Sequence, residues 1–275
     1  MKIDAVNAEA KMPVLKMRMT VNYHTHSYHC RHAGGKPEEY VLAAIENGLE
    51  ELGFSDHVPY PFSNGHRSGF RMDVEETETY VNEILELREK YKGQIKILIG
   101  YEAEYYPVEF EAMMKNITRF PLDYLICGQH FTRNEYDGKY CGVPSDDIDQ
   151  LAGYVDQLTA AMASGAYTYI CHPDMYNFTG DDTAYTEQVI RLCEASAKYD
   201  VPLEYNCLGM EGKRHYPADR FWKTVATTSA KVAVGSDAHQ PDRAGNQESF
   251  ARALANLAGF GITPLDRPVI KKPVF

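Results

Sequence analysis

The stretch "VNYHTHSYHCRHAGG", residues 21–35, places four histidines within nine residues and ends in two glycines. The residues around His24 and His26 alternate as in a β-strand, so these two side chains leave the same face and can bind one ion. A pair with this spacing also arises by chance. It therefore indicates a metal site only if other parts of the chain supply further ligands.

The composition excludes several classes of protein. The chain has 275 residues, of which 44% are hydrophobic and 24% charged, which is enough for a sizeable core. The formal net charge is -11. Because an acidic chain without basic clusters repels phosphate backbones, we expect no nucleic-acid partner, although a small anion could still bind a locally positive pocket.

The chain carries no evident targeting signal. It has no apolar run long enough to span a membrane, and residues 1–20 lack the apolar segment of a signal peptide. We therefore expect a cytoplasmic protein with no membrane partner. The six cysteines form no Cys-x-x-Cys pair and are expected to be reduced and mostly buried, with only Cys30 placed between histidines. The oligomeric state is not predicted.

Seven apolar runs alternate with segments of helical spacing. This alternation favours parallel βα units, and the lack of a dinucleotide-binding or P-loop fingerprint favours a closed or nearly closed barrel over a doubly wound sheet. We expect one such α/β domain over residues 1–275. The expected strands lie within residues 19–26, 51–57, 95–105, 122–131, 166–174, 201–207 and 231–239.

The segments between the strands carry helix signals. Pro37 can open the first helix and Gly48 can end it, while Ser145 is expected to cap a later one. The polar loop at residues 59–73 follows the second strand and is expected to overhang the barrel mouth. Apolar stripes mark the helices at residues 41–45, 84–91, 110–117, 151–162, 189–193, 221–225 and 250–257.

Nearly every expected strand ends in a side chain that can bind a metal. The carboxyl ends of the strands in a parallel barrel form one face, so ligands far apart in the sequence become neighbours. His29, His66 and His215 fall outside this pattern and are expected to be structural. The predicted ligands are His24, His26, His57, Glu102, His130, His172, Asp237 and His239.

A series of short motifs accompanies these residues: "HTHSYHCRHAGG", "GFSDHVPY", "GYEAEY", "GQHF", "CHPD", "YNCLGMEGKRHYP" and "GSDAH". Together they resemble the polymerase-and-histidinol-phosphatase (PHP) family of metal-dependent phosphoesterases, over essentially the whole chain. The first two motifs are most similar to the histidinol-phosphatase branch. The resemblance implies a distorted TIM-like (β/α)7 barrel that hydrolyses histidinol phosphate to histidinol and phosphate.

The resemblance also implies how the ligands are shared among two or three divalent metals. His32 is preferred to His29 because it precedes the small-residue turn at the corresponding family position. Mixed imidazole and carboxylate ligands suit Zn, Fe or Mn better than Ca or Mg. The implied sets are His24, His26, Glu102 and Asp237 for the first metal, Glu102, His130 and His172 for the second, and His32, His57 and His239 for the third.

The predicted chemistry is attack of water on a small phosphomonoester, without a protein nucleophile. Asp237 either manages the proton of the leaving group or is a ligand only. Arg214 resembles the family's basic substrate-binding position and can hold phosphate with two hydrogen bonds, whereas Lys213 brings charge without that geometry. Glu204 and Asn206 alternate on the sixth strand, so they either bind the substrate or support a neighbouring ligand.

Three alternatives stay open. A PHP phosphoesterase for another small substrate, such as a sugar phosphate or nucleotide, would keep the ligands and change the loops at the mouth. A metal-dependent amide or ring hydrolase on a related barrel is disfavoured, since no lysine ends an expected strand. A non-catalytic metal-binding PHP scaffold is disfavoured because every ligand position is filled. Metal analysis together with phosphate release separates these alternatives.

Overall fold

The computed structural model describes residues 17–273. Most of the N-terminal stretch used above to argue against a signal peptide lies outside this range. Among the described helices, none is both long enough and apolar enough to cross a lipid bilayer. The cytoplasmic location and the single domain over residues 1–275 stay predictions.

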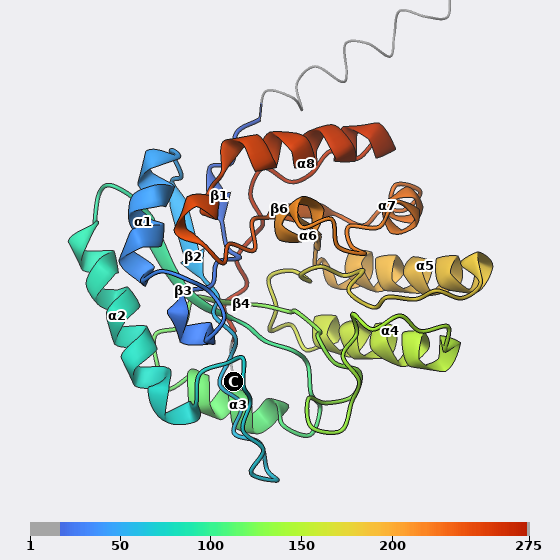
Figure 1. The fold of residues 1–275 in the computed structure, drawn as a ribbon, viewed down its shortest axis with the longest axis horizontal. Helices are drawn as coiled ribbons and strands as arrows, with labels where there is room; N and C mark the ends of the chain where they lie inside the picture. The colour runs from blue at the N-terminus through green and yellow to red at the C-terminus, as the bar shows by residue number, and fades with distance from the viewer. Residues whose placement is uncertain (1–16, 274–275) are drawn as a thin grey trace, which may run out of the picture.

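The strands form two parallel sheets at the centre of the molecule (Figure 1). The first sheet is curled and has the strand order β1-β2-β3-β4, and the second pairs β5 with β6. This arrangement confirms the predicted α/β class with a parallel sheet. The strands are β1 (Val21–Asn22), β2 (Glu51–Phe54), β3 (Lys96–Glu102), β4 (Tyr124–Ile126), β5 (Leu203–Asn206) and β6 (Val232–Gly235).

The segment predicted as the fifth strand, residues 166–174, is not a strand in the structure, so that prediction was wrong. It makes only isolated parallel bridges, from Ile170 to Cys127 beyond β4 and to Leu203 in β5. Another isolated bridge joins Thr25, beyond β1, to Ala238, beyond β6. The extended backbone of residues 166–174 ends at His172, because this residue has a positive φ of 28°, which is outside the β region.

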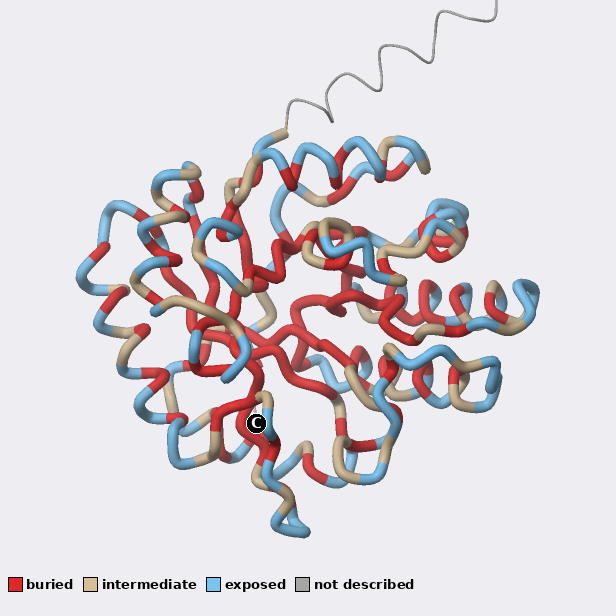
Figure 2. The backbone as a smooth tube through the Cα atoms, viewed as in Figure 1, coloured by how far each residue is buried: buried red, intermediate tan, exposed pale blue. Residues whose placement is uncertain are grey.

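The helices surround the strands, and Figure 2 shows their inner faces buried and their outer faces exposed. Every predicted apolar stripe falls on a helix, because each stripe packs toward the strands. The helices are α1 (Pro37–Glu46), α2 (Thr77–Lys90), α3 (Phe110–Ile117), α4 (Ile148–Ala163), α5 (Asp182–Tyr199), α6 (Cys207–Glu211), α7 (Asp219–Val225) and α8 (Gln247–Phe260), with short 3₁₀ turns η2 (Tyr28–Cys30), η3 (Val74–Glu76) and η4 (Pro241–Arg243).

The predicted helix boundaries hold at α1 and fail at α4. Pro37 is the first residue of α1, and Gly48 follows its end with a φ of +76°, which glycine adopts without strain. Ser145 does not cap α4. The side chain of Asp147 accepts hydrogen bonds from the first free backbone N–H groups instead. The Ser145 hydroxyl accepts from the backbone N–H of Asp147, the residue just before the helix.

A small buried cluster lies beneath the ends of the first strands. Tyr124 is fully buried, and its hydroxyl donates to the carbonyl oxygens of Tyr23 and Phe54. Its ring fills the space beside Gly53 and Gly100, where a Cβ atom would come within 2.3 and 2.4 Å of it. Because Gly53 and Gly100 have no side chains, Tyr124 can pack directly against the strands. It lies below the residues that follow the strand ends.

Candidate active site

A cavity of about 400 Å³ lies where the strands end. Most of the predicted ligands line it, and His24 and His26 lie behind its wall with no exposed surface. The loop at residues 59–73 contributes Phe70 to the wall, as expected for a loop over the mouth. The lining residues are His32, His57, Phe70, Glu102, His130, Phe131, Tyr140, His172, Met175, Leu208, Arg214, Tyr216, Asp237 and His239.

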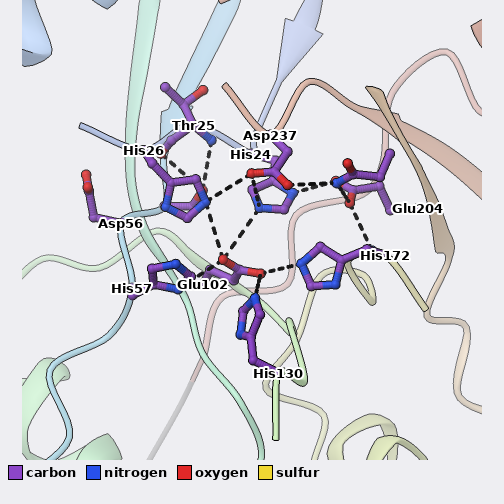
Figure 3. A network of polar contacts seen from close by, with 12 residues as sticks. His24, Thr25, His26, Asp56, His57, Glu102, His130, His172, Glu204 and Asp237 are labelled. Carbon is purple, nitrogen blue, oxygen red and sulfur yellow. Dashed lines mark hydrogen bonds and ion pairs between the residues drawn. The ribbon is translucent and has the colours of Figure 1, made fainter. Parts of the chain in front are cut away.

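Glu102, the last residue of β3, lies at the centre of the ligand group (Figure 3). Its Oε2 atom is 3.6 Å from His24 Nε2 and 3.3 Å from His26 Nε2. The same oxygen is 3.1 Å from His57 Nδ1. One oxygen of this carboxylate thus faces three histidines from the first two strand ends.

The other oxygen of Glu102 faces a second pair of histidines. Oε1 is 2.9 Å from His172 Nε2 and 3.5 Å from His130 Nε2. Figure 3 shows the two sets of side chains on opposite sides of the carboxylate. This is the arrangement expected of a carboxylate that bridges two ions.

Asp237, which follows β6, lies beside His24 and His26 of the first group. Its Oδ1 atom is 3.4 Å from Nε2 of both His24 and His26, and 3.2 Å from His239 Nδ1. Its Oδ2 atom accepts a hydrogen bond from Asn206 Nδ2 at 3.1 Å. Asp237 has a φ of 50°, a backbone conformation that non-glycine residues adopt rarely and often at functional sites.

His32, His57 and His239 form a third group, with one nitrogen of each within 4.8 Å of the others. His32 Nδ1 donates to the carbonyl oxygen of Cys30 at 2.7 Å, which turns Nε2 toward His239 Nε2, 3.1 Å away, where the two nitrogens could bind one ion. Burial lowers the pKa of His32 to about 4, so its ring is neutral at pH 7. His57 touches the first group through Nδ1 and stacks on His32, with ring centroids 5.1 Å apart.

The three histidines predicted to be structural lie apart from these groups. His29 Nε2 is 2.9 Å from Glu83 Oε2, and His66 Nε2 is 3.1 Å from Glu135 Oε1. His215 Nε2 donates to a backbone carbonyl oxygen. The geometry therefore favours His32 over His29. Cys30 is closer than expected, since its sulfur lies within 4.8 Å of ligand nitrogens of His26 and His239.

The residues present fit bound metal ions. The nitrogen–oxygen separations around Glu102 run from 2.9 to 3.6 Å, and two ligands of one tetrahedral ion, each bound at about 2.0 Å, lie about 3.3 Å apart. Buried polar atoms without a partner are rare in proteins unless a ligand supplies one. Among the predicted ligands, such atoms are Nε2 of His24, both ring nitrogens of His26, Nδ1 of His57 and His172, and Oδ1 of Asp237.

Electrostatics keep two of these groups in the form that binds metals. Burial alone would raise the pKa of Glu102, but the positive charge of the nearby His130 and His24 rings holds it well below its usual value. Burial lowers the pKa of His57 well below its usual value, although the nearby Glu102 carboxylate opposes this. The structure thus favours an ionised carboxylate and a neutral imidazole, as metal binding requires.

Glu204 and Asn206 contact predicted ligands and do not line the cavity. Glu204 is fully buried, with Oε1 2.7 Å from His24 Nδ1 and Oε2 accepting from the backbone N–H of His172 at 3.0 Å. Asn206 donates to Glu204 and to Asp237. Of the two roles predicted for this pair, the geometry favours support, since substrate in the cavity would not reach them.

The two predicted basic residues after β5 differ in position. Arg214 lines the cavity, and its Nη1 donates to the hydroxyl of Tyr216 at 2.7 Å. Lys213 is exposed and is not among the lining residues. Its positive φ of 49° belongs to the turn after α6. The prediction that Lys213 contacts substrate is therefore not supported by its position.

Sequence reasoning missed one carboxylate beside the ligands. Glu104 is fully buried, and its Oε1 is 2.9 Å from His130 Nδ1. The signal was available in "GYEAEY", where Glu104 follows Glu102 at the same two-residue spacing that was used for His24 and His26. The aromatic wall formed by Phe70, Phe131 and Tyr140 carried no such signal.

The sequence pattern of the PHP domain matches residues 22–207 of this chain. The chain belongs to the PHP family. This PHP protein is 31% identical over 256 residues to the histidinol-phosphatase of Lactococcus lactis, covering 87% of this chain and 91% of the relative. It is 28% identical over 247 residues to a probable histidinol-phosphatase of Deinococcus radiodurans, covering 86% and 92%.

A solved PHP structure has a similar fold. It is the histidinol phosphate phosphatase of Lactococcus lactis, crystallised with zinc, L-histidinol and phosphate. The match covers 94% of this chain and 99% of that one, with a TM-score of 0.69 and 20% sequence identity. The family resemblance predicted from the motifs is thus confirmed.

Proposed function

We propose that this PHP protein is a metal-dependent phosphomonoesterase that hydrolyses histidinol phosphate to histidinol and phosphate. The observation that carries the proposal is the convergence of histidines on the two oxygens of Glu102 at one end of the cavity. The names of the Lactococcus and Deinococcus relatives support the substrate.

We propose that the three ligand sets hold two or three ions of Zn, Fe or Mn. Bound there, such ions would polarise the phosphoryl oxygens and make water nucleophilic at neutral pH. Glu102 and Asp237 are the two ligand carboxylates lining the cavity, so three divalent charges would leave it strongly positive. An acidic protein can thus attract a phosphate.

The other cavity residues would bind and orient the substrate. Arg214, on the wall, would donate to phosphate oxygens, with Tyr216 holding its guanidinium in place. Asp237 would bind a metal through Oδ1, because Asn206 already donates to Oδ2, and this position favours its role as a ligand over proton transfer. Phe70, Phe131 and Tyr140 would exclude water and accept a small ring such as imidazole.

We also propose that the two sheets act as one distorted (β/α)7 barrel, closed by the isolated bridges of Ile170, Thr25 and their partners. Closure of this kind would bring the ends of β1 and β6 together, as the contacts of His24 and His26 with Asp237 require.

The substrate is tested by phosphate release from histidinol phosphate, p-nitrophenyl phosphate and a sugar phosphate, using protein of measured metal content. We expect kcat/KM to be highest for histidinol phosphate, and the gene to rescue a bacterial auxotroph that lacks histidinol phosphatase. A higher kcat/KM on another substrate would point to a different small phosphomonoester. No release from any substrate at full metal content would indicate a non-catalytic scaffold.

Arg214→Ala should lower kcat/KM about ten- to hundredfold, because a hydrogen bond between charged groups contributes roughly 1.5 to 3 kcal/mol. Arg214→Lys should lose less, since it keeps the charge but not the two-pronged geometry. Lys213 directly precedes Arg214 in the chain but lies outside the cavity, so Lys213→Ala is the matched control. Wild-type kinetics for Arg214→Ala at equal metal content would show that Arg214 does not bind the phosphate.

A further inference from the structure

Arg71, near the end of the loop at residues 59–73, is a buried cation outside the predicted ligand sets. Only 1% of its surface is exposed. Arginine is almost never fully buried unless its charge is paired. Burying an ion pair costs about as much free energy as the pairing returns, so stability alone is a weak reason for its presence.

The guanidinium of Arg71 connects three segments of the chain. Nη1 and Nη2 donate to the two oxygens of Glu104, after β3, at 3.0 and 2.8 Å. Nε donates to Glu135 Oε2, in the loop after β4, at 3.1 Å. Nη1 also donates to the carbonyl oxygen of Val58, next to the ligand His57. Arg71 therefore fixes these segments relative to one another.

The contact with Glu104 leads directly into the ligand group. Glu104 Oε1 accepts a hydrogen bond from His130 Nδ1 at 2.9 Å, which directs Nε2 of the same ring toward Glu102. A carboxylate behind a ligand histidine fixes both the tautomer and the orientation of the ring. Because Arg71 holds both oxygens of Glu104, it determines where that carboxylate lies.

The same guanidinium supports the aromatic wall of the cavity. It lies 4.4 Å from the centre of the Phe70 ring, a distance at which a cation and an aromatic face attract each other. Phe70 stacks on Phe131 with ring centres 5.9 Å apart, and its edge meets His57. Glu135 lies four residues after Phe131, so Arg71 holds the segments of both phenyl rings.

We propose that Arg71 is a positioning residue for phosphate hydrolysis. Through Glu104 it fixes His130 as a metal ligand, and through Phe70 and Glu135 it holds the aromatic wall against the substrate. The proposal deepens the function proposed above and rests on it. Arg71 itself does not line the cavity, so it acts through other residues.

The test compares Arg71→Met, Arg71→Lys and Glu104→Gln with Arg67→Met. Arg67 lies on the same loop with its side chain 76% exposed, so Arg67→Met is the matched control. The first readout is metal affinity, measured by competition with a chelator. The second is the visible absorption spectrum of the cobalt-substituted protein, which reports ligand geometry. The third is kcat and KM for histidinol phosphate.

We expect Glu104→Gln and Arg71→Met each to weaken metal binding about 10- to 100-fold, as is typical for partners behind a ligand histidine. Both should change the cobalt spectrum. Arg71→Met should also raise KM, because the aromatic wall loosens, whereas Glu104→Gln should leave KM unchanged. Arg71→Lys should restore part of the metal affinity, and Arg67→Met should resemble the wild type in every readout.

The double variant tests the route through Glu104. If Arg71 acts on the metal through Glu104, Arg71→Met combined with Glu104→Gln should weaken metal binding no more than the stronger single variant. Losses that add in the double variant would overturn that route. Wild-type affinity, spectrum and KM in Arg71→Met, or equal losses in Arg67→Met, would overturn the proposal as a whole.

The same variants distinguish the proposal from two other outcomes: a variant that does not fold, and a wild-type protein that does not hydrolyse histidinol phosphate. If Arg71→Met does not fold, Glu104→Gln still decides the question, because unchanged metal affinity and spectrum in that variant would contradict the proposal. If the wild-type protein releases no phosphate from histidinol phosphate, the proposed function fails. The metal affinity and the cobalt spectrum would then still decide whether Arg71 positions His130.

Discussion

Glu102→Gln is expected to lower kcat/KM for phosphate release on the order of a thousandfold or more. Glutamine has the same size, so the fold should persist, but the negative charge between His26, His57 and His172 is lost. Glu102 would bridge two ions, so its loss would affect both, and each bound ion would contribute several kcal/mol to stabilising the transition state. Kinetics and metal content of the purified variant are the measurements.

Glu109→Gln is the matched control for this substitution. Glu109 is also a buried carboxylate, 1% exposed, but it accepts hydrogen bonds from Ser63 and does not line the cavity. It should retain wild-type metal content and kinetics. Near-wild-type activity and full metal content in Glu102→Gln would contradict the role of Glu102 as a bridge.

Gly128→Ala is expected to have the second-largest effect, although glycine has no side chain to react. A Cβ atom at Gly128 would lie 1.7 Å from Glu102 Oε1, so the carboxylate has to move. A displacement of about 1 Å in a catalytic group can cost on the order of a hundredfold in rate. We expect a loss of that size in kcat/KM, together with lower metal content.

Gly153→Ala provides the comparison for Gly128→Ala. Gly153 is exposed in α4, and an added Cβ atom there meets nothing within 4 Å. Alanine in a helix interior is more stable than glycine by about 1 kcal/mol, so this variant should keep its activity and unfold at a slightly higher temperature. Equal activity of the two variants would mean that close packing against Gly128 does not fix the position of the Glu102 carboxylate.

The ligand positions could be predicted from the sequence because they follow a local rule. Each strand is marked by its own apolar run, and the predicted ligand lies at or shortly after its end: Glu102 is the last residue of β3, and His57 lies three residues beyond β2. Parallel pairing then brings these ends together without further information. The helix start at Pro37 was predictable for the same reason, since it depends on one residue.

Other features depend on packing between distant segments. Residues 166–174 have a strand-like composition, but the positive φ of His172 ends the extended backbone. Glu204 and Arg214 read equally well as substrate contacts, and only the fold buries one and places the other in the cavity. Arg71 reads as one more charge in a polar loop, because its partners lie 33 and 64 residues away.

If the proposed function is right, bound metal makes this cavity a phosphatase for histidinol phosphate. The most direct measurement removes metal with a chelator, adds Zn, Fe or Mn back in steps, and follows phosphate release against bound metal per chain. We expect no release from the metal-free protein, and recovery only as two or more ions bind. Full release from metal-free protein, or no release when the ligand sets are filled, would contradict it.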